Sequence, residues 1–240
     1  MLYDCASIAL SALSTPKNGD TPDLINTIAS EFSRSTAYFR FPIIDVGANS
    51  AMAAPGELLY LIDHLTRAGY VTRVLTSGQH FVDFNESCQQ VRDMVRLGVT
   101  RVILRLDPTL VLTLSDTTLA NYVSACIESG LNAEMRFEFD DDLPETFFDI
   151  IRKIEQLRFY TKLYPFKKRL TTRYAFDLST ISSVLHMGQP RLVISEDKAV
   201  LLRVRGAVYS DFMIGYIDEN QPLSEMICPA RLLRPQERRL

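Results

Sequence analysis

The chain has 240 residues, enough to bury a full hydrophobic core in one large domain or in one domain with a small addition. Hydrophobic residues make up 47% and charged residues 23%, which is typical of a globular protein and argues against long disordered stretches. The net charge of -3 offers no general attraction for nucleic acid or anionic lipid, and no apolar run is long enough to span a bilayer. We therefore expect a cytoplasmic protein that binds neither nucleic acid nor membrane.

Strands alternate with helices along the first 170 residues. Strands are expected within residues 2–10 and over 38–46, 71–76, 100–106, 132–139 and 160–166, and helices over 22–33, 55–68, 85–97, 115–129 and 144–157. Pro55 and Pro144 suit the first turns of their helices, and Ser115 is a suitable N-cap. This order is typical of an α/β fold.

One phrase recurs three times, as "HLTRAGYVTRVLTSG", "MVRLGVTRVILRLDP" and "CIESGLNAEMRFEFD". Each contains the end of an amphipathic helix, then Gly69, Gly98 or Gly130, then a strand, with a period of about 30 residues. Glycine at that place suits a left-handed helix C-cap, and parallel strands need crossovers of this kind. Six such units suit either a barrel or an open doubly wound sheet.

After about residue 170 the rhythm changes. "RLVISEDKAVLLRVRG" predicts two short strands about a turn at Glu196, Asp197 and Lys198, and "FMIGYIDENQPLSEMI" predicts a further strand. We therefore expect residues 1–170 to form the β/α region and residues 171–240 to form a small C-terminal region.

Charged residues alternate with apolar ones on two of the predicted strands. In "RFEFDDD", Phe137 and Phe139 share one face, and Arg136, Glu138 and Asp140 share the other. Fully buried parallel strands usually read as continuous apolar runs, so these charges indicate a polar or mutually paired interior. The preceding strand does the same, with Arg101, Arg105 and Asp107 opposite Val102, Leu104 and Leu106.

Two interpretations of these charges stay open. In the first, the side chains line a site for a polar ligand near the carboxyl ends of the strands, and the residues concerned are Arg105, Asp107, Arg136, Glu138 and Asp140. In the second, they form an internal salt-bridge network without a ligand. His80 follows a predicted strand and is a candidate proton carrier, although a loop histidine is commonly only solvated.

The cysteines give no sign of a metal site. Cys5, Cys88, Cys126 and Cys228 stand alone, with neither a C-x-x-C pair nor a histidine at metal spacing. Cys88 and Cys126 fall on apolar faces of predicted helices, where a thiol usually packs as a small hydrophobic group. We expect no bound metal.

The series "IIDVGANSAMAAPGELLYLIDHLTRAGYVTRVLTSG" and "GVTRVILRLDP" resembles the radical S-adenosylmethionine superfamily. Gly47-Ala48-Asn49 stands where that family has Gly-Gly-Glu, and Thr76-Ser77-Gly78 stands for its Thr-Asn-Gly. The C-terminal stretch "RLVISEDKAVLLRVRGAVYSDFMIGYIDENQPLSEMI" is similar to the SPASM or twitch region of peptide-modifying members. The resemblance implies a partial (β/α)6 TIM-like barrel with parallel strands and a small C-terminal β-hairpin appendage. It also implies ligand contacts at Gly47, Asn49, Thr76 and Ser77, beside Arg105 and Arg136 from the strand pattern.

The motifs that would carry the radical chemistry are absent from the sequence. No C-x-x-x-C-x-x-C loop surrounds Cys5, so the three thiolates that hold a four-iron cluster are missing. Asn49 stands in place of the acidic residue that would receive the cofactor's amine. The resemblance therefore implies a cluster-free pseudoenzyme, and we expect no iron–sulfur cofactor.

Three functional hypotheses follow. The first is a binding or accessory subunit for an active radical enzyme or its peptide substrate in a maturation pathway, with a protein or peptide as partner. The second is a β/α-barrel enzyme in which Asp107, Glu138 and Asp140 do acid–base chemistry while Arg105 or Arg136 binds a small anionic substrate. The third is retained binding of S-adenosylmethionine without a cluster.

Overall fold

The protein is represented by a computed structural model. The structure describes residues 5–9, 21–47, 55–140, 142, 144–157, 161–167, 171–175, 190–195, 199–205 and 209–216. Its helices are α1 (Thr21–Ser35), η2 (Thr36–Tyr38), α2 (Pro55–Arg67), α3 (Phe84–Arg96), α4 (Pro108–Thr113), α5 (Asp116–Glu128) and α6 (Glu145–Leu157). Its strands are β1 (Ala6–Ala9), β2 (Ile43–Gly47), β3 (Val71–Thr76), β4 (Val99–Leu106), β5 (Glu134–Phe139), β6 (Lys162–Lys167), β7 (Thr171–Ala175), β8 (Arg191–Ile194), β9 (Ala199–Arg205) and β10 (Tyr209–Tyr216).

All of these strands belong to one sheet, in the order β6-β5-β4-β3-β2-β1-β8-β9-β10-β7. Strands β1 to β6 pair in parallel, each with its neighbour in the sequence, as the repeated helix–glycine–strand phrase predicts. The sheet curves but does not close, because β6 and β7 form its two edges. The fold is therefore an α/β partial barrel.

The predicted C-terminal hairpin is present as β8 and β9, which pair antiparallel. It continues the barrel sheet, because β8 pairs in parallel with β1 on its other side. Beyond it, β10 pairs antiparallel with β9 and parallel with β7. Strands on both sides of residue 170 thus share one sheet, while the division into two domains there stays a prediction.

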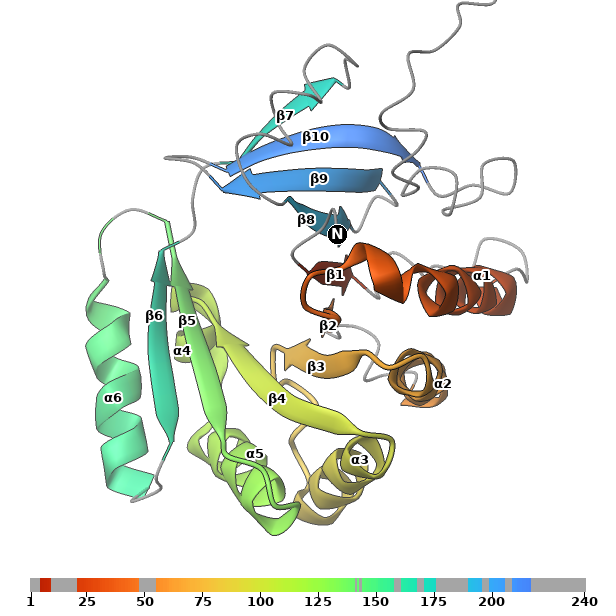
Figure 1. The fold of residues 1–240 in the computed structure, drawn as a ribbon. Helices are drawn as coiled ribbons and strands as arrows, with labels where there is room; N and C mark the ends of the chain where they lie inside the picture. Colours follow the sequence, from red (N-terminus) through yellow and green to blue (C-terminus); the bar gives the residue numbers. More distant parts are fainter. Residues whose placement is uncertain are drawn as a thin grey trace, which may run out of the picture.

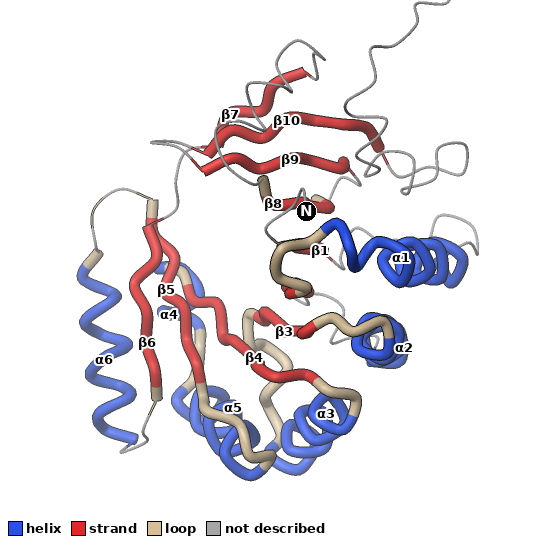
Figure 2. Tube along the Cα trace, in the orientation of Figure 1, coloured by secondary structure: helices blue, strands red, loops and turns tan. Residues whose placement is uncertain are grey.

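The helices cover the outer face of the curved sheet (Figures 1 and 2). Alternate residues of each central strand face them, so that Val102, Leu104, Met135 and Phe137 are fully buried in the main hydrophobic cluster. Because side chains on a strand alternate between faces, the residues between these point to the inner face of the sheet. The inner face is where the charged residues lie.

The three repeated glycines all adopt positive φ, at 91° for Gly69, 96° for Gly98 and 77° for Gly130. This confirms the predicted left-handed caps. At Gly98 a side chain is excluded twice over, because L residues rarely adopt this φ and an added Cβ would lie 2.5 Å from Cγ2 of Thr66. Each cap ends a helix shortly before the next strand begins.

Two described helices of the barrel region, the 3-10 helix η2 and helix α4, were not predicted. Helix α4 follows β4 directly, with Asp107 as N-cap and Pro108 in the first turn. The Asp–Pro pair is a recognised helix start, but six residues are too few to show hydrophobic periodicity. Among the described residues, no helix is both long and apolar enough to cross a membrane.

Candidate functional site

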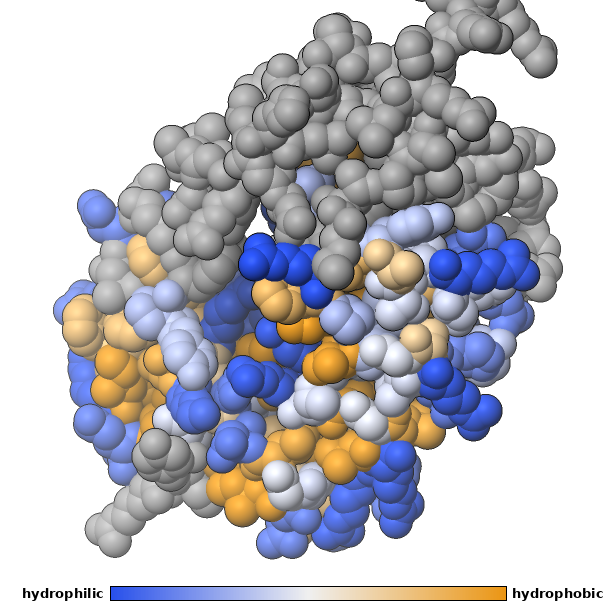
Figure 3. All heavy atoms as spheres, viewed as in Figure 1, coloured by the Kyte–Doolittle hydropathy of each residue, from blue (hydrophilic) through white to orange (hydrophobic). Residues whose placement is uncertain are grey.

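Strands β4 and β5 carry charged side chains on their inner faces. Arg101 and Arg105 alternate with the buried Val102 and Leu104 on β4, and Arg136 follows the same rule on β5. In Figure 3, hydrophilic residues gather over β4 and β5 among apolar ones. The alternation predicted from the sequence is therefore present in the sheet.

Three of the predicted site residues form one cluster, which we call the Glu138 cluster. Arg105 donates two hydrogen bonds to the Glu138 carboxylate, from Nε to Oε1 at 3.1 Å and from Nη2 to Oε2 at 2.9 Å. Arg136 donates to Oε1 from Nε at 2.7 Å and also from Nη2. Arg105 and Arg136 lie opposite each other in the parallel register, so two guanidinium groups converge on one buried carboxylate.

The surroundings of Glu138 favour its charged form. Burial alone would raise the pKa of Glu138, but the hydrogen bonds and positive charges of Arg105 and Arg136 outweigh burial and leave this pKa below its ordinary value. A general acid at neutral pH needs a raised pKa instead. The cluster is therefore built to hold charge and does not suit proton transfer by Glu138.

A second group lies on β2, β3 and β8, and we call it the Asp45 cluster. Arg73 Nε donates to Asp45 Oδ1 at 2.6 Å, and Arg191 Nη1 lies 3.9 Å from Oδ2 of the same carboxylate. Arg191 Nε also lies 3.0 Å from the sulfur of Cys5. Here too, two arginines share one buried carboxylate.

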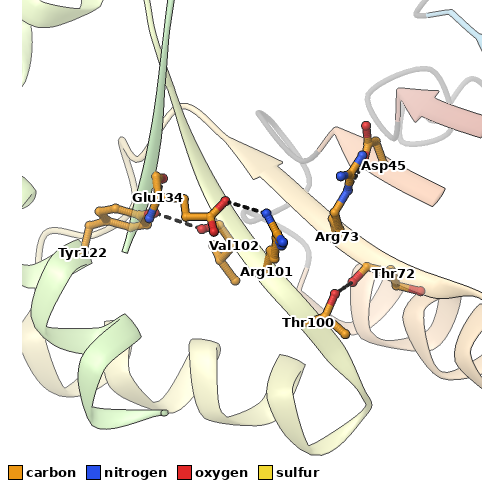
Figure 4. A network of polar contacts seen from close by, with 8 residues as sticks. All are labelled: Asp45, Thr72, Arg73, Thr100, Arg101, Val102, Tyr122 and Glu134. Atoms are coloured by element: carbon orange, nitrogen blue, oxygen red, sulfur yellow. Dashed lines mark hydrogen bonds and ion pairs between the residues drawn. The ribbon is translucent and has the colours of Figure 1, made fainter. Parts of the chain in front are cut away.

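Arg101 and Glu134 form an ion pair between the two clusters, with Nη1 and Oε2 3.2 Å apart (Figure 4). The backbone of Glu134 is fixed from the helix side by the buried Tyr122, whose hydroxyl lies 2.5 Å from the Glu134 carbonyl and 2.9 Å from that of Val102.

A further pair joins β9 and β10, where Arg203 donates two hydrogen bonds of 2.7 Å to Asp211.

The acidic and basic side chains of these ion pairs differ in their exposure to solvent. The carboxylate side chains are nearly buried: Asp45 is 8% exposed, Glu134 7%, Glu138 6% and Asp211 2%. The arginine side chains that hold them are more open: Arg73 is 25% exposed, Arg101 52%, Arg105 35%, Arg136 26%, Arg191 39% and Arg203 32%. The accessible charge on this face is therefore cationic, above a layer of buried carboxylates.

Other predicted acid–base residues occupy different surroundings. Asp107 caps α4 by accepting the Leu110 N–H at 2.8 Å, and Asp140 is exposed just beyond β5. His80 lies in the loop after β3, where burial lowers its pKa to about 4. In the described part of the chain its Nε2 has no hydrogen-bond partner. A histidine of this pKa is neutral at pH 7 and a weak base, which does not favour proton transfer.

The positions taken from the family resemblance lie at strand ends. Gly47 ends β2 and Thr76 ends β3, where the Thr76 hydroxyl accepts the Gly78 N–H at 3.2 Å. Ser77 follows in the loop, and Asn49 lies outside the described residues. These positions stay predictions as ligand contacts.

Sequence reasoning missed the Asp45 cluster and the Arg203–Asp211 pair. The signal was present, since "IIDVG" and "VTRVLT" each hold one charged residue within an apolar strand. Their pairing across β2, β3 and β8 could not be read from spacing, because Arg191 lies far along the chain from Asp45.

The cysteines within the described residues are buried and unpaired with one another, which agrees with the packing role predicted for Cys88 and Cys126. Burial raises the pKa of both thiols, to about 12 for Cys126. Cys228 lies outside the described residues. Among those described, no three His, Cys, Asp or Glu side chains are grouped so that they could hold a metal ion.

Comparison with known proteins gives structural likenesses alone. No protein-family model and no curated protein matches the chain. Tryptophan synthase from M. tuberculosis is similar at 14% identity and a TM-score of 0.39, over 80% of this chain and 73% of that one.

Two further barrel structures show the same level of likeness. KD(P)GA from T. tenax is similar at 12% identity and a TM-score of 0.40, over 82% of this chain and 70% of its own. A mutant tryptophan synthase alpha-subunit from Pyrococcus furiosus has 11% identity and a TM-score of 0.39, over 82% and 89%. These values are too low to bear on function.

Proposed function

We propose that the chain is a binding protein whose inner sheet face takes a ligand with anionic groups, in a non-redox role without acid–base chemistry of its own. The observation that carries this is the layering of charge, with arginines accessible and their carboxylates buried beneath. Because an arginine side chain is longer than that of aspartate or glutamate, the guanidinium groups reach past the buried carboxylates and are the charges that a ligand would meet first.

The buried carboxylates prepare the arginines for a ligand. A guanidinium carries five N–H donors in a rigid plane, and Glu138 receives two from Arg105 and two from Arg136. Fixing the plane in advance lowers the entropy lost when an anion binds, because the long side chain is already ordered. Hydrogen bonds between guanidinium and carboxylate or phosphate are also among the strongest in proteins.

This proposal keeps one part of each of the first two sequence-based hypotheses. It keeps the binding role of the first and the anionic ligand of the second. Acid–base catalysis by Glu138 is left out because its pKa is lowered and both its oxygens accept from arginine. Descent from a radical S-adenosylmethionine scaffold and service to a radical enzyme stay predictions, carried by the sequence motifs.

Titration calorimetry with citrate and with polyglutamate tests the proposal. At low salt we expect heat of binding with at least one of these anions, and an affinity that falls as salt rises, because the contacts are charge–charge. The double variant R105Q/R136Q should bind at least tenfold more weakly. As a matched control, R92Q/R96Q removes two positive charges from α3 on the helix side of the sheet, where Arg92 is 45% exposed and Arg96 72%, and should bind like the original protein.

Two results would contradict the proposal. One is the absence of binding by every anion tested at low salt. The other is equal loss of affinity in the R92Q/R96Q control, which would mean that overall charge, and not the inner face, attracts the anion.

A further inference from the structure

We infer that Arg73 on β3 and Arg101 on β4 hold one oxyanion group of the ligand between them, and we call these two residues the Arg73–Arg101 pair. The group is a phosphate or a carboxylate, since both accept several hydrogen bonds from arginine. This inference rests on the proposed function, and it adds which residues hold a single anionic group of the ligand.

The two arginines lie beside each other on the inner face of the sheet. The register of β3 and β4 pairs Arg73 with Arg101, and the following residues, Val74 and Val102, are buried on the helix side. Neighbouring strands lie about 4.8 Å apart, so one small oxyanion can reach both guanidinium groups. Like charges opposite each other on adjacent strands repel, and an anion between them would remove this repulsion.

A β-bulge in β4 brings the two arginines opposite each other. Thr72 pairs with Val99, whereas the next residue of β3, Arg73, pairs with Arg101. Thr100 is therefore one extra residue in β4, and its hydroxyl donates to the Thr72 carbonyl at 3.2 Å (Figure 4). Without this extra residue, Arg73 would lie opposite Thr100. Bulges change the direction of side chains and are common next to active sites, so this one supports a positioning role.

Both arginines keep N–H donors that the described residues do not use. A guanidinium carries five such donors. Among the described residues, Arg73 donates one hydrogen bond, from Nε to Asp45. Arg101 likewise donates one, from Nη1 to Glu134. These carboxylates lie on the outer sides of the pair, on β2 and β5, so neither takes the position between the two arginines (Figure 4).

The Glu138 cluster shows how such a pair holds a carboxylate. Arg105 and Arg136 are also lateral partners on adjacent strands, and both donate to Oε1 of Glu138. Glu138 lies two residues beyond Arg136 on the same strand. The residue two beyond Arg101 is Ile103, which has no carboxylate to offer. The pair on β3 and β4 thus has the same lateral arrangement, and the ligand would supply the oxyanion.

Titration calorimetry at low salt with inorganic phosphate and with acetate tests the inference. We expect at least one of these single-group anions to bind, and the double variant R73Q/R101Q to bind it at least tenfold more weakly, because charge-assisted hydrogen bonds are lost. R73K/R101K keeps the charges without the planar donors and should have an intermediate affinity. A preference for phosphate or for acetate identifies which group of a ligand the pair takes, and either preference supports the site.

Two further double variants serve as comparisons. R105Q/R136Q should lose less affinity for phosphate and acetate than R73Q/R101Q does, because Glu138 already lies between Arg105 and Arg136. R92Q/R96Q removes the same number of positive charges from α3 and should bind like the original protein. Thermal unfolding shows whether each variant is folded.

Nitrogen-15 NMR of the unaltered protein gives a measurement that needs no double variant. Whichever of phosphate and acetate binds should shift the Nε–H signals of Arg73 and Arg101 more than those of Arg105 and Arg136. Single glutamine variants assign each signal. Larger shifts at Arg105 and Arg136 would place the anion in the Glu138 cluster and overturn the inference.

The outcomes separate this inference from the proposed function. No binding by phosphate, acetate, citrate or polyglutamate would overturn both. Binding of citrate or polyglutamate without phosphate or acetate would overturn the Arg73–Arg101 site alone. So would an affinity for the single-group anions that R73Q/R101Q leaves unchanged, or that R105Q/R136Q lowers as much. A loss of at least tenfold in R73Q/R101Q that exceeds the loss in R105Q/R136Q supports the site.

Discussion

The two faces of strand β5 differ in almost every physical respect. Met135 and Phe137 point to the helices and are fully buried among apolar side chains, whereas Glu134, Arg136 and Glu138 point to the inner face and are held by ion pairs. The apolar face stabilises the fold through burial, which scales with area. The charged face contributes less to stability, since paired charges recover little more than their loss of hydration.

The two faces of one short strand can therefore have separate roles: the apolar face stabilises the fold, and the charged face is available for binding. Substitutions on the apolar face should change the free energy of unfolding strongly. Substitutions on the charged face should change ligand affinity more than stability. Four variants test that division.

The largest expected effect is that of Phe137→Ala. Phe137 is fully buried and makes an edge-to-face contact with Phe147, at a ring distance of 5.3 Å. Its truncation should lower the free energy of unfolding by about 3–5 kcal/mol, measured by urea denaturation. Val82→Ala, at a side chain 70% exposed, is the control and should change it by less than about 0.5 kcal/mol. Equal effects would mean that the helix-covered face is not the stabilising one.

Glu138→Gln should lower the free energy of unfolding by about 2 kcal/mol, because two arginines lose a charged acceptor while remaining partly solvated. The lowered pKa of Glu138 also sets a pH dependence. A carboxylate whose pKa is lower in the folded state stabilises the fold above its unfolded pKa, near 4.5, and this contribution is lost as pH falls through the folded value.

Urea denaturation of the original protein between pH 6 and pH 3 should therefore show a steeper fall in stability on acidification than E138Q shows. Parallel profiles for the two proteins would mean that Glu138 has the same pKa in the folded and unfolded chain.

Tyr122→Phe should lower the free energy of unfolding by about 1–1.5 kcal/mol, because the buried hydroxyl hydrogen-bonds to the backbones of both β4 and β5. Amide hydrogen exchange at Glu134 should also become faster, since its N–H donates to this hydroxyl at 3.1 Å. Unchanged exchange there would show that β5 does not depend on Tyr122 for its position.

The smallest effect on stability is expected for Arg101→Ala, less than about 1 kcal/mol, because the arginine is half exposed and its pair is screened by water. Its effect on binding should be larger in proportion, with a several-fold loss of affinity for polyglutamate or citrate. A stability loss as large as that of F137A would contradict the division between the two faces.

Much of the fold could be predicted because local signals agree with one another. The positions of Gly69, Gly98 and Gly130 marked the helix ends, and the apolar alternation of β4 and β5 marked the covered face. Helix α4 was missed because it is too short for a periodic pattern. The pairing of β8 with β1 was missed because nothing local in "RLVI" specifies a partner so distant in the chain.

The sequence predicted the Glu138 cluster but not the Asp45 cluster. Arg105, Arg136 and Glu138 lie on sequence-adjacent strands of a regular repeat, so alternation alone placed them together. Arg191 lies near Asp45 because β8 pairs with β1. This pairing belongs to the topology of the sheet, which local sequence patterns do not show. The proton-carrier role considered for His80 depended on its pKa, and burial, which sets that pKa, is a tertiary property.

The place of β1 in the middle of the sheet affects the order in which its two sides can pair with other strands. Ala6 pairs with Ile44 on one side and with Leu192 on the other. During synthesis, one side of β1 can pair as soon as residues 43–47 have left the ribosome, while the other must wait for residues 191–194. Its unmatched peptide groups are thus open to other strands while about 150 further residues are made. A short strand of four residues limits the chance of mispairing during that interval.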